Sequence, residues 1–280
     1  MIKFEKEIGV EKKIKDLREN LQGMQNILVA YSGGVDSTFL LKIAQEELKN
    51  RVIAVTIKTE VHTAEEISRA KKMAQRWGIK HLVKEFSILN NPEFVKNPLE
   101  RCYICKREIF QIIQEIAKAN HIKYIVDGSN YSDLNDFRPG LRALRELKIK
   151  SPLQEVFLSK EEIRLASKEM NLSNWNKPSN SCLATRVPYY EEINQEKLTR
   201  IEQSEDFLHQ LGIEQVRVRC HDKLARIEVT EKDIPRLMNK KNRKEIISQL
   251  KSIGFTYCSL DLAAYPDKVE NKNSLKKGKG

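Results

Sequence analysis

The chain has 280 residues, 40% of them hydrophobic, which is enough to bury a core in one large domain or two smaller ones. Its 50 lysines and arginines outnumber 39 acidic residues, giving a net charge of +11 that suits polyanionic or phosphorylated partners. The lysines are scattered along the chain, so charge alone does not indicate nucleic-acid binding. A membrane-spanning helix needs about 18 consecutive apolar residues, and no segment of the sequence reaches that length.

The first 20 residues are charged and predict a helix rather than a secretion signal. Five cysteines in a chain of this length, without such a signal, indicate a reducing compartment and argue against a disulfide scaffold. We therefore expect a cytoplasmic protein.

The first 150 residues alternate short apolar runs, rich in β-branched residues, with longer segments of helical spacing. The predicted strands are 26–31, 51–57, 81–86 and 123–128. The predicted helices between them are 37–49, 63–77 and 107–120. This alternation predicts an α/β fold with a parallel sheet flanked by helices, and such sheets bind ligands beyond the carboxyl ends of their strands.

The pattern changes near Pro188, which we take as the boundary between two domains, 1–187 and 188–280. The predicted elements after it are a helix at 191–211, strands at 214–220 and 224–230, a helix at 243–253 and a strand at 256–262. The second domain is therefore expected to be a small α+β unit.

The segment "YSGGVDST" (31–38) follows the first predicted strand and opens the first predicted helix. Free amides and the helix dipole favour an anion at such a position. Gly33 and Gly34 would let the backbone approach a phosphate, and Ser32 and Ser37 would add hydroxyl donors. A bare Ser-Gly-Gly also fits an ordinary tight turn with a capping side chain. The segment matches neither the usual P-loop nor the dinucleotide-binding Gly-x-Gly-x-x-Gly pattern.

The six residues "SGGVDS" (32–37) resemble the PP-loop of the ATP pyrophosphatase family. The resemblance implies that the loop binds the β,γ-pyrophosphate of ATP, which leaves when AMP is transferred to a substrate oxygen. Asp36 would then help to hold Mg²⁺, whose charge stabilises the transition state. The implied nucleotide-binding residues are Ala30, Ser32, Gly33, Gly34, Asp36, Ser37 and Gly128.

Three cysteines are candidates for metal or redox chemistry. Cys102 and Cys105 form a Cys-x-x-Cys motif before a helix, and Cys182 lies in "PSNSCLATR". Their spacing alone leaves open a zinc site, a [4Fe–4S] cluster with one open iron, or free thiols. A structural zinc needs four ligands, and Cys220 with His221 could supply more only from the second domain.

Longer motifs carry a more specific resemblance. The segments 97–110, 127–144, 178–193 and 216–229 resemble the LarE family of sulfur transferases, and the resemblance extends from the glycine loop to about residue 262. It implies an enzyme that thiolates pyridinium-3,5-biscarboxylic acid mononucleotide, a step towards the nickel-pincer nucleotide. ATP adenylates a substrate carboxylate, and sulfur then displaces AMP.

This family has two forms. One has a single cysteine, matching Cys182, and gives up its own sulfur, which leaves dehydroalanine. The other also has the Cys-x-x-Cys motif and binds a [4Fe–4S] cluster through three thiolates. The sequence resembles the second form, which implies that Cys102, Cys105 and Cys182 ligate a cluster whose open iron carries sulfide.

Six further residues are candidates for catalysis or for binding an anionic substrate. Arg217 and Arg219 alternate along one strand and so share a face, where guanidinium groups suit carboxylate or phosphate. The resemblance implies that they contact the substrate phosphate, although a solvated strand face is the alternative. Arg138 and Arg142 are candidates for anion contacts near the cluster.

Arg186 is a further candidate for an anion contact, because it lies four residues after Cys182. Glu205, in the long helix, aligns with a family acid near the active site, although an isolated glutamate on a long helix is commonly solvated. We assign both residues to the catalytic set.

The sequence therefore indicates an ATP-dependent sulfur transferase that uses ATP, Mg²⁺ and a [4Fe–4S] cluster. Its expected partners are a carboxylated pyridinium mononucleotide, sulfide or another sulfur donor, and further copies of itself, with no membrane or nucleic acid. A tRNA thiolation enzyme of the same superfamily is the first alternative, but five cysteines are too few for extra zinc ribbons and no RNA-binding module is appended. A zinc-stabilised nucleotide-binding protein without catalysis is the second.

Overall fold

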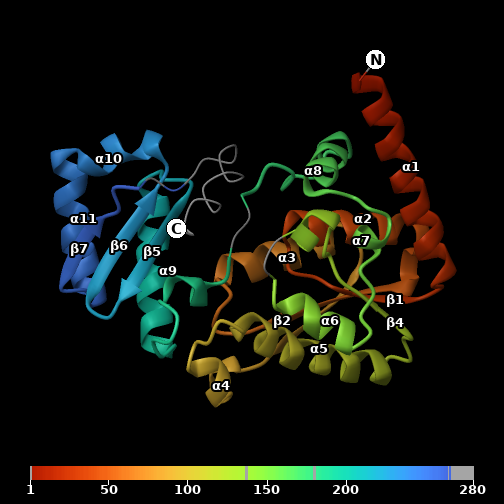
Figure 1. The fold of residues 1–280 in the computed structure, drawn as a ribbon, viewed down its shortest axis with the longest axis horizontal. Coiled ribbons are helices and arrows are strands. Elements are labelled where there is room, and N and C mark those ends of the chain that lie inside the picture. The colour runs from red at the N-terminus through yellow and green to blue at the C-terminus, as the bar shows by residue number, and fades with distance from the viewer. Residues whose placement is uncertain (1, 136–137, 179–180, 264, 266–280) are drawn as a thin grey trace, which may run out of the picture. The chain divides into compact units, whose positions relative to one another are not determined.

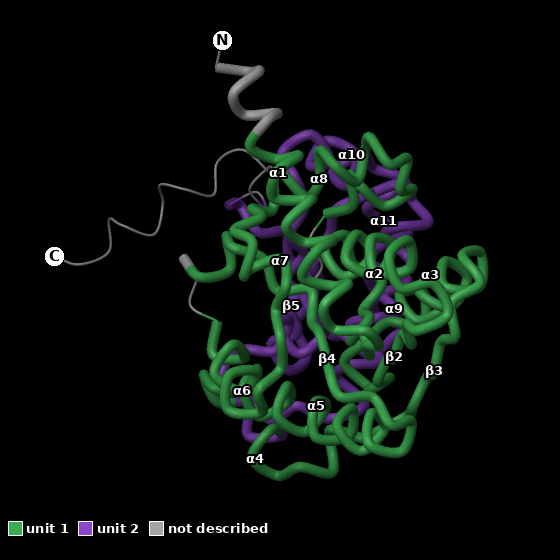
Figure 2. Tube along the Cα trace, turned by 90° about the vertical axis from the view of Figure 1, so that its right-hand side faces the viewer, with its two compact units in different colours: residues 1–94, 98–180 green, residues 95–97, 181–280 purple. Residues whose placement is uncertain are grey.

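The computed structural model describes residues 2–135, 138–178, 181–263 and 265 (Figure 1). The chain divides into two compact units, which Figure 2 distinguishes by colour. Unit 1 comprises residues 1–94 and 98–180, and unit 2 comprises residues 95–97 and 181–280. Cys182 and Arg186 thus fall in unit 2, whereas the boundary expected from the sequence lay after residue 187.

Unit 1 is built on a four-stranded parallel sheet in the order β3-β2-β1-β4. Its strands are β1 (Ile27–Ala30), β2 (Val52–Lys58), β3 (Lys80–Glu85) and β4 (Tyr124–Val126). In the register of the sheet, Ile27 of β1 lies opposite Val52 of β2 and Tyr124 of β4. The predicted fold class, a parallel sheet flanked by helices, is confirmed.

Helices cover both faces of this sheet (Figure 1). They are α1 (Ile2–Gly23), α2 (Val35–Leu48), α3 (Ala64–Arg76), α4 (Pro92–Val95), α5 (Arg101–Ala119), α6 (Gly140–Glu146), α7 (Pro152–Glu155) and α8 (Lys160–Glu169). Because side chains alternate along a strand, Ile27 and Val29 of β1 pack into the core with α1, α2 and α8, while Leu28 packs against α5 and α6. Burial of apolar side chains on both faces explains why β1, β2 and β4 are largely hydrophobic, whereas the edge strand β3 is more polar and more exposed.

Unit 2 contains the smaller sheet that the sequence predicts. Its elements are α9 (Gln195–Gln210), β5 (Val216–His221), β6 (Leu224–Val229), α10 (Ile234–Met238), α11 (Lys240–Ile253) and β7 (Tyr257–Leu260). β5 pairs with β6 in antiparallel fashion, and β6 pairs with β7 in parallel. The helix α9 begins at Gln195 because the Asn194 side chain accepts the Lys197 amide at 2.9 Å, capping the first turn.

Within the described part of the chain, none of the helices combines the length and the apolar character needed to cross a bilayer.

Candidate functional site

The glycine loop joins the carboxyl end of β1 to the first turn of α2. Gly33 has a φ of +71°, a conformation that favours glycine, and an added Cβ would lie 3.2 Å from the Cβ of Ala70. Gly34 is the N-cap of α2 and offers no side chain to the first-turn amides. Those amides are therefore available to an anion, which the helix dipole also favours.

Gly128, just beyond β4, packs against this first turn. A Cβ at Gly128 would lie 2.8 Å from the amide nitrogen of Ser37 and 2.9 Å from its Cα. Only glycine fits so close an approach of two backbone segments. Two hydroxyl contacts complete the loop: Ser32 Oγ lies 3.0 Å from Ser37 Oγ and accepts the Gly34 amide at 3.3 Å.

Asp36, in the first turn of α2, carries the carboxylate of the loop. Its Oδ1 is buried and has no hydrogen-bond partner among the described residues, while its Oδ2 lies 4.0 Å from Lys160 Nζ. Burial raises the pKa of Asp36, an effect that Lys160 opposes and Asp133 reinforces. A buried carboxylate oxygen without a donor suits a hard cation, and Mg²⁺ is held in such sites by one or two carboxylates together with substrate phosphates. The residues present therefore fit Mg²⁺.

Two more carboxylates lie near the carboxyl end of β4. Asp127 accepts the Ser129 hydroxyl at 2.5 Å and the Ser151 hydroxyl at 2.6 Å, and its Oδ2 is 3.7 Å from Lys106 Nζ. Asp133 accepts a hydrogen bond from the backbone amide of Asn130 at 3.0 Å. Arg138, a predicted substrate ligand, forms an ion pair with Asp133 at 3.0 Å.

Cys102 and Cys105 lie in the first turn of α5, three positions apart and hence on one face of the helix. Neither is in a disulfide; Cys102 is exposed and Cys105 half-buried. A helix N-terminus stabilises a thiolate, so this donor pair suits a metal or cluster. Across 2–135, 138–178, 181–263 and 265, no group of three or more His, Cys, Asp or Glu side chains is gathered in a metal-binding arrangement.

Arg142, the other predicted substrate ligand of unit 1, braces α6 against the start of α5. Its guanidinium donates to Glu100 at 3.1 Å and lies 3.7 Å from the centre of the Tyr103 ring. Glu146 adds a contact at 3.6 Å. These contacts hold Arg142 beside the start of α5, where the two cysteines lie.

Cys182, in unit 2, precedes the 3-10 turn Leu183–Arg186 and is half-buried. Its carbonyl accepts the Thr185 hydroxyl at 2.8 Å and Arg186 Nη1 at 3.2 Å. The same Nη1 donates to the Ser181 carbonyl at 2.6 Å. Arg186 therefore holds the backbone around the cysteine.

Glu205, on α9, binds Arg186 with both carboxylate oxygens at 2.9 Å. Both side chains are buried, and Glu205 also accepts the Val218 amide of β5 at 2.8 Å. Glu205 is thus a buried partner that links the Cys182 turn to β5, rather than a solvated residue.

The two arginines of β5 differ in their partners. Arg219 binds Glu228 with two bonds of 2.9 and 2.8 Å and donates to the Thr185 carbonyl at 2.6 Å. Arg217 lies over the Tyr265 ring at 4.4 Å, with no hydrogen bond or ion pair to any described residue. Burial lowers the pKa of Arg217. This half-buried guanidinium therefore has donors that no described residue accepts, because its contact with Tyr265 is to the ring face.

The two remaining cysteines of unit 2 lie within strands, Cys220 in β5 and Cys258 in β7. Cys220 is buried and Cys258 half-buried, and burial raises the pKa of both thiols. A raised pKa disfavours the thiolate that metal binding requires.

Comparisons with known proteins identify relatives along nearly the whole chain. Residues 17–106 match the asparagine synthase family. The chain is 39% identical over 256 residues to an uncharacterized protein of Synechocystis sp., covering 91% of this chain and 96% of that protein. It is 34% identical over 257 residues to an uncharacterized protein of Methanocaldococcus jannaschii, covering 91% and 97%.

A third relative is the pyridinium-3,5-bisthiocarboxylic acid mononucleotide synthase of Lactiplantibacillus plantarum. The chain is 33% identical to it over 246 residues, which are 88% of each protein. The chain belongs to the LarE family. LarE membership and the asparagine synthase match, which spans the glycine loop, together support an ATP-dependent enzyme.

The structure also reveals polar contacts of this LarE-family chain that the motifs did not indicate. Asn174 is buried and donates to the Gly33 carbonyl at 3.3 Å and to Thr38 Oγ1 at 3.0 Å. Lys160 approaches Asp36, and Glu228 binds Arg219. The contacts of Asn174 and of Lys160 join residues far apart in sequence, whereas Arg219 and Glu228 lie on the paired strands β5 and β6. Only the capping box at the start of α8 gives a local signal for Lys160.

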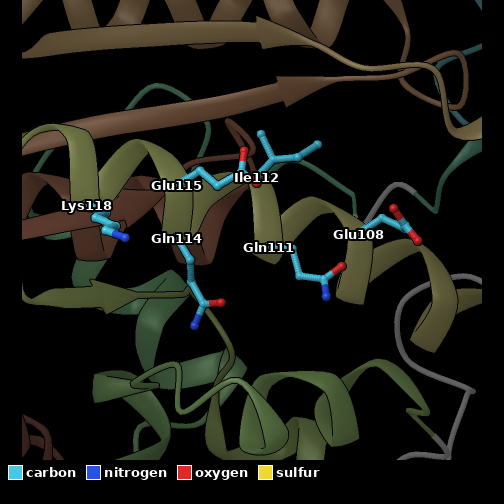
Figure 3. Close-up of a pocket in the computed structure, with 6 residues that line it drawn as sticks. All are labelled: Glu108, Gln111, Ile112, Gln114, Glu115 and Lys118. Atoms are coloured by element: carbon cyan, nitrogen blue, oxygen red, sulfur yellow. The ribbon is translucent and has the colours of Figure 1, made fainter.

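A pocket of about 530 Å³ lies along α5 (Figure 3). It is lined by Glu108, Gln111, Ile112, Gln114, Glu115 and Lys118. None of these residues belongs to the site predicted for this LarE-family chain, which includes the glycine loop and the cysteines.

Replacing Gly128 by alanine is expected to destabilise unit 1 by about 1–3 kcal/mol, the usual cost of overpacking, and to weaken ATP binding by displacing the first turn of α2. Urea unfolding and calorimetric titration with ATP measure both effects. Gly23→Ala is the matched control, since an added Cβ there meets nothing within 4 Å. Equal stability and ATP affinity in the two variants would contradict the steric argument.

Replacing Glu205 by alanine is expected to lower the free energy of unfolding by about 3–5 kcal/mol, because Arg186 is left buried without its carboxylate. Glu196→Ala on the same helix serves as the control: that side chain is 79% exposed, and its loss should cost less than about 1 kcal/mol. Denaturant titration compares them. A solvated Glu205 would make the two variants indistinguishable.

Proposed function

We propose that the protein is an ATP-dependent sulfur transferase that thiolates a carboxylate of pyridinium-3,5-biscarboxylic acid mononucleotide. The glycine loop, the arginine-rich strand β5 and the membership of the LarE family support this substrate and this reaction. The proposal rests above all on one combination: an anion-binding loop at the start of α2 and a pair of thiols in the first turn of α5, in a chain of this family.

The reaction has two steps. A substrate carboxylate oxygen attacks the α-phosphorus of ATP, a new P–O bond forms, and the bond to pyrophosphate breaks. Hydrosulfide then attacks the acyl carbon, the bond to AMP breaks, and a thiocarboxylate, AMP and a proton result. No net oxidation or reduction takes place, so the protein needs to orient the groups and stabilise two leaving groups.

Residues of unit 1 would act in the first step. The amides at the start of α2 would bind the leaving pyrophosphate, and Ser32 and Ser37 would offer hydroxyl donors. Asp36 would hold Mg²⁺, which when bound supplies positive charge against the leaving group. The buried, unpartnered Oδ1 of Asp36 supports this role.

Cysteine thiolates would act in the second step. Cys102, Cys105 and Cys182 would ligate a [4Fe–4S] cluster, which when bound supplies an iron with an open position for sulfide. The pair of cysteines at the start of α5 and the cysteine before the Leu183–Arg186 turn, none of them in a disulfide, support this set. Because the transferred sulfur would come from this sulfide, the cysteine sulfur atoms would stay in the protein. Each chain could then catalyse the reaction repeatedly.

Arg217 is the better candidate of the two β5 arginines for the substrate phosphate. Arg219 is already bound to Glu228 and to a backbone carbonyl, whereas Arg217 has donors without partners among the described residues. Glu205, by fixing Arg186 and β5, would keep Cys182 and Arg217 in position.

Anaerobically purified protein incubated with ATP, Mg²⁺, sulfide and the biscarboxylic mononucleotide is expected to form AMP and thiocarboxylate, with several products per chain and no change in protein mass. Intact-protein mass spectrometry distinguishes this from the sacrificial reaction, in which one product per chain leaves Cys182 lighter by about 34 Da through loss of H₂S. Alanine at position 102, 105 or 182 should abolish iron binding. Cys258→Ala is the control that should retain it.

Replacing Arg217 by alanine is expected to weaken substrate binding by about 1.5–3 kcal/mol, the range for a hydrogen bond to a charged group, without changing ATP affinity. Arg219→Ala should instead lower the stability of the fold, because Glu228 loses its two bonds to Arg219 and keeps only its ion pair with Arg226. Separate titrations with substrate and ATP, together with urea unfolding, test this. Unchanged substrate affinity in Arg217→Ala would assign Arg217 to a solvated strand face.

A further inference from the structure

Asn174 lies in the turn 173–176 after α8, and its side chain is buried against the glycine loop. Its Nδ2 donates to the Gly33 carbonyl at 3.3 Å and to Thr38 Oγ1 at 3.0 Å. Assuming the pyrophosphate-binding role proposed above for the loop, we infer that Asn174 is a positioning residue. It holds the Gly33 carbonyl towards the protein interior and thereby keeps the Gly34 amide turned towards the anion.

The peptide between Gly33 and Gly34 has one buried and one exposed side. It is trans, so its carbonyl and its N–H point in opposite directions. The carbonyl meets Asn174 in a buried contact, and the Gly34 N–H donates to Ser32 Oγ at 3.3 Å in an exposed one. Ser32 Oγ lies 3.0 Å from Ser37 Oγ, so this N–H faces the hydroxyls assigned to pyrophosphate. Rotation of the peptide would put a carbonyl oxygen there, which cannot donate to phosphate.

This peptide rotates easily, because it has glycine on both sides and glycine lacks the Cβ that restricts the backbone. A restraint must therefore come from elsewhere in the fold. The turn that carries Asn174 is itself fixed, since Arg164 of α8 donates to the carbonyls of Trp175 and Lys177 at 2.9 and 2.5 Å. A buried side chain on a fixed turn supplies the restraint that the two glycines lack.

The donors of Asn174 fit this role. A primary amide carries two N–H donors on one nitrogen, and both are used, one on Gly33 and one on Thr38. The Gly33 carbonyl can only accept, which fixes the orientation of the amide. Asn174 Oδ1 is buried and has no hydrogen-bond partner among the described residues. An unpaired buried oxygen costs about 1–3 kcal/mol, a cost that an apolar side chain would avoid, so the two donors rather than packing account for an asparagine here.

Calorimetric titration of the full-length protein with magnesium pyrophosphate and, separately, with AMP tests this role. Asn174→Leu, of similar size but without donors, should weaken pyrophosphate binding by about 10- to 150-fold, the range for one hydrogen bond to a charged group, and change AMP binding less than about twofold. Thr38→Val is the matched control. It also removes a hydrogen bond of Asn174 but leaves the bond to Gly33, so it should bind pyrophosphate as the wild type does.

Nuclear magnetic resonance follows the same peptide directly, in the wild type as well as in the variants. The sequence has 11 glycines, and Gly33–Gly34 is the only adjacent pair among them. In protein labelled with ¹³C-carbonyl, ¹⁵N-glycine, a single resonance therefore correlates the Gly33 carbonyl with the Gly34 amide. Magnesium pyrophosphate should shift the amide proton of this resonance in the wild type. Asn174→Leu should shift its carbonyl carbon before any ligand is added, and Thr38→Val should not.

Pyrophosphate affinity that is equal in Asn174→Leu and the wild type would overturn the inference, as would an equal loss of affinity in Thr38→Val or an equal loss of AMP binding. A Gly34 resonance that magnesium pyrophosphate leaves unchanged in the wild type would overturn it together with the assignment of the loop. Asn174-dependent pyrophosphate binding in a protein that forms no thiocarboxylate would uphold the role of Asn174 and reject the proposed substrate instead.

Discussion

The close approach of Gly128 to the first turn of α2 is the contact on which the glycine loop depends. β1 and β4 are adjacent parallel strands, so both end at one edge of the sheet, and the backbone after β4 must pass the helix that follows β1. An added Cβ 2.8 Å from the Ser37 amide leaves no room for any other residue. The loop is therefore shaped by the sheet beneath it as much as by Gly33 and Gly34.

Unit 2 depends on a different constraint, the pairing of buried charges. Glu205 binds Arg186 with both oxygens. Glu228 binds Arg219 with both oxygens and also pairs with Arg226 at 3.2 Å. Removing a buried charge from water is costly unless its partner and further donors are in place, and Glu205 has the Val218 amide as well. Arg226 is paired with Glu228 and Asp261, whereas Arg217 has no ion pair among the described residues, and an anion is its natural partner.

The sequence predicts correctly those parts of the fold in which apolar residues recur with a clear period. The predicted strands and helices up to residue 120 are present, because their apolar residues recur with the spacing of strands and helices. The stretch from Gly128 to Pro188 received no assignment. Two of its helices, α6 and α7, have seven and four residues, too few to establish a helical period. The third, α8, has ten residues and a capping box formed by Ser159 and Glu162, which is a local signal for its start.

The parts of the candidate site whose residues are adjacent in the sequence were predictable. The parts that depend on contacts between distant residues were less so. The glycine loop and the Cys102–Cys105 pair are read from adjacent residues. The burial of Glu205 is not, since it comes from Arg186 on a 3-10 turn and from the amide of Val218. The approach of Lys160 to Asp36 likewise needs the packing of α8 against α2, which no local pattern encodes.

The presence of an acid in an anion-binding loop follows from what catalysis requires. A loop with only positive groups would bind ATP and pyrophosphate alike, and equal binding does not lower the barrier between them. Asp36, Asp127 and Asp133 each lie beside a cation in the resting protein, so these charges are largely matched before nucleotide arrives. In the proposed reaction Asp36 would hold Mg²⁺, whose positive charge would lie where the leaving pyrophosphate accumulates negative charge. The carboxylate would thus bring a divalent cation into the loop for the transition state instead of weakening the loop.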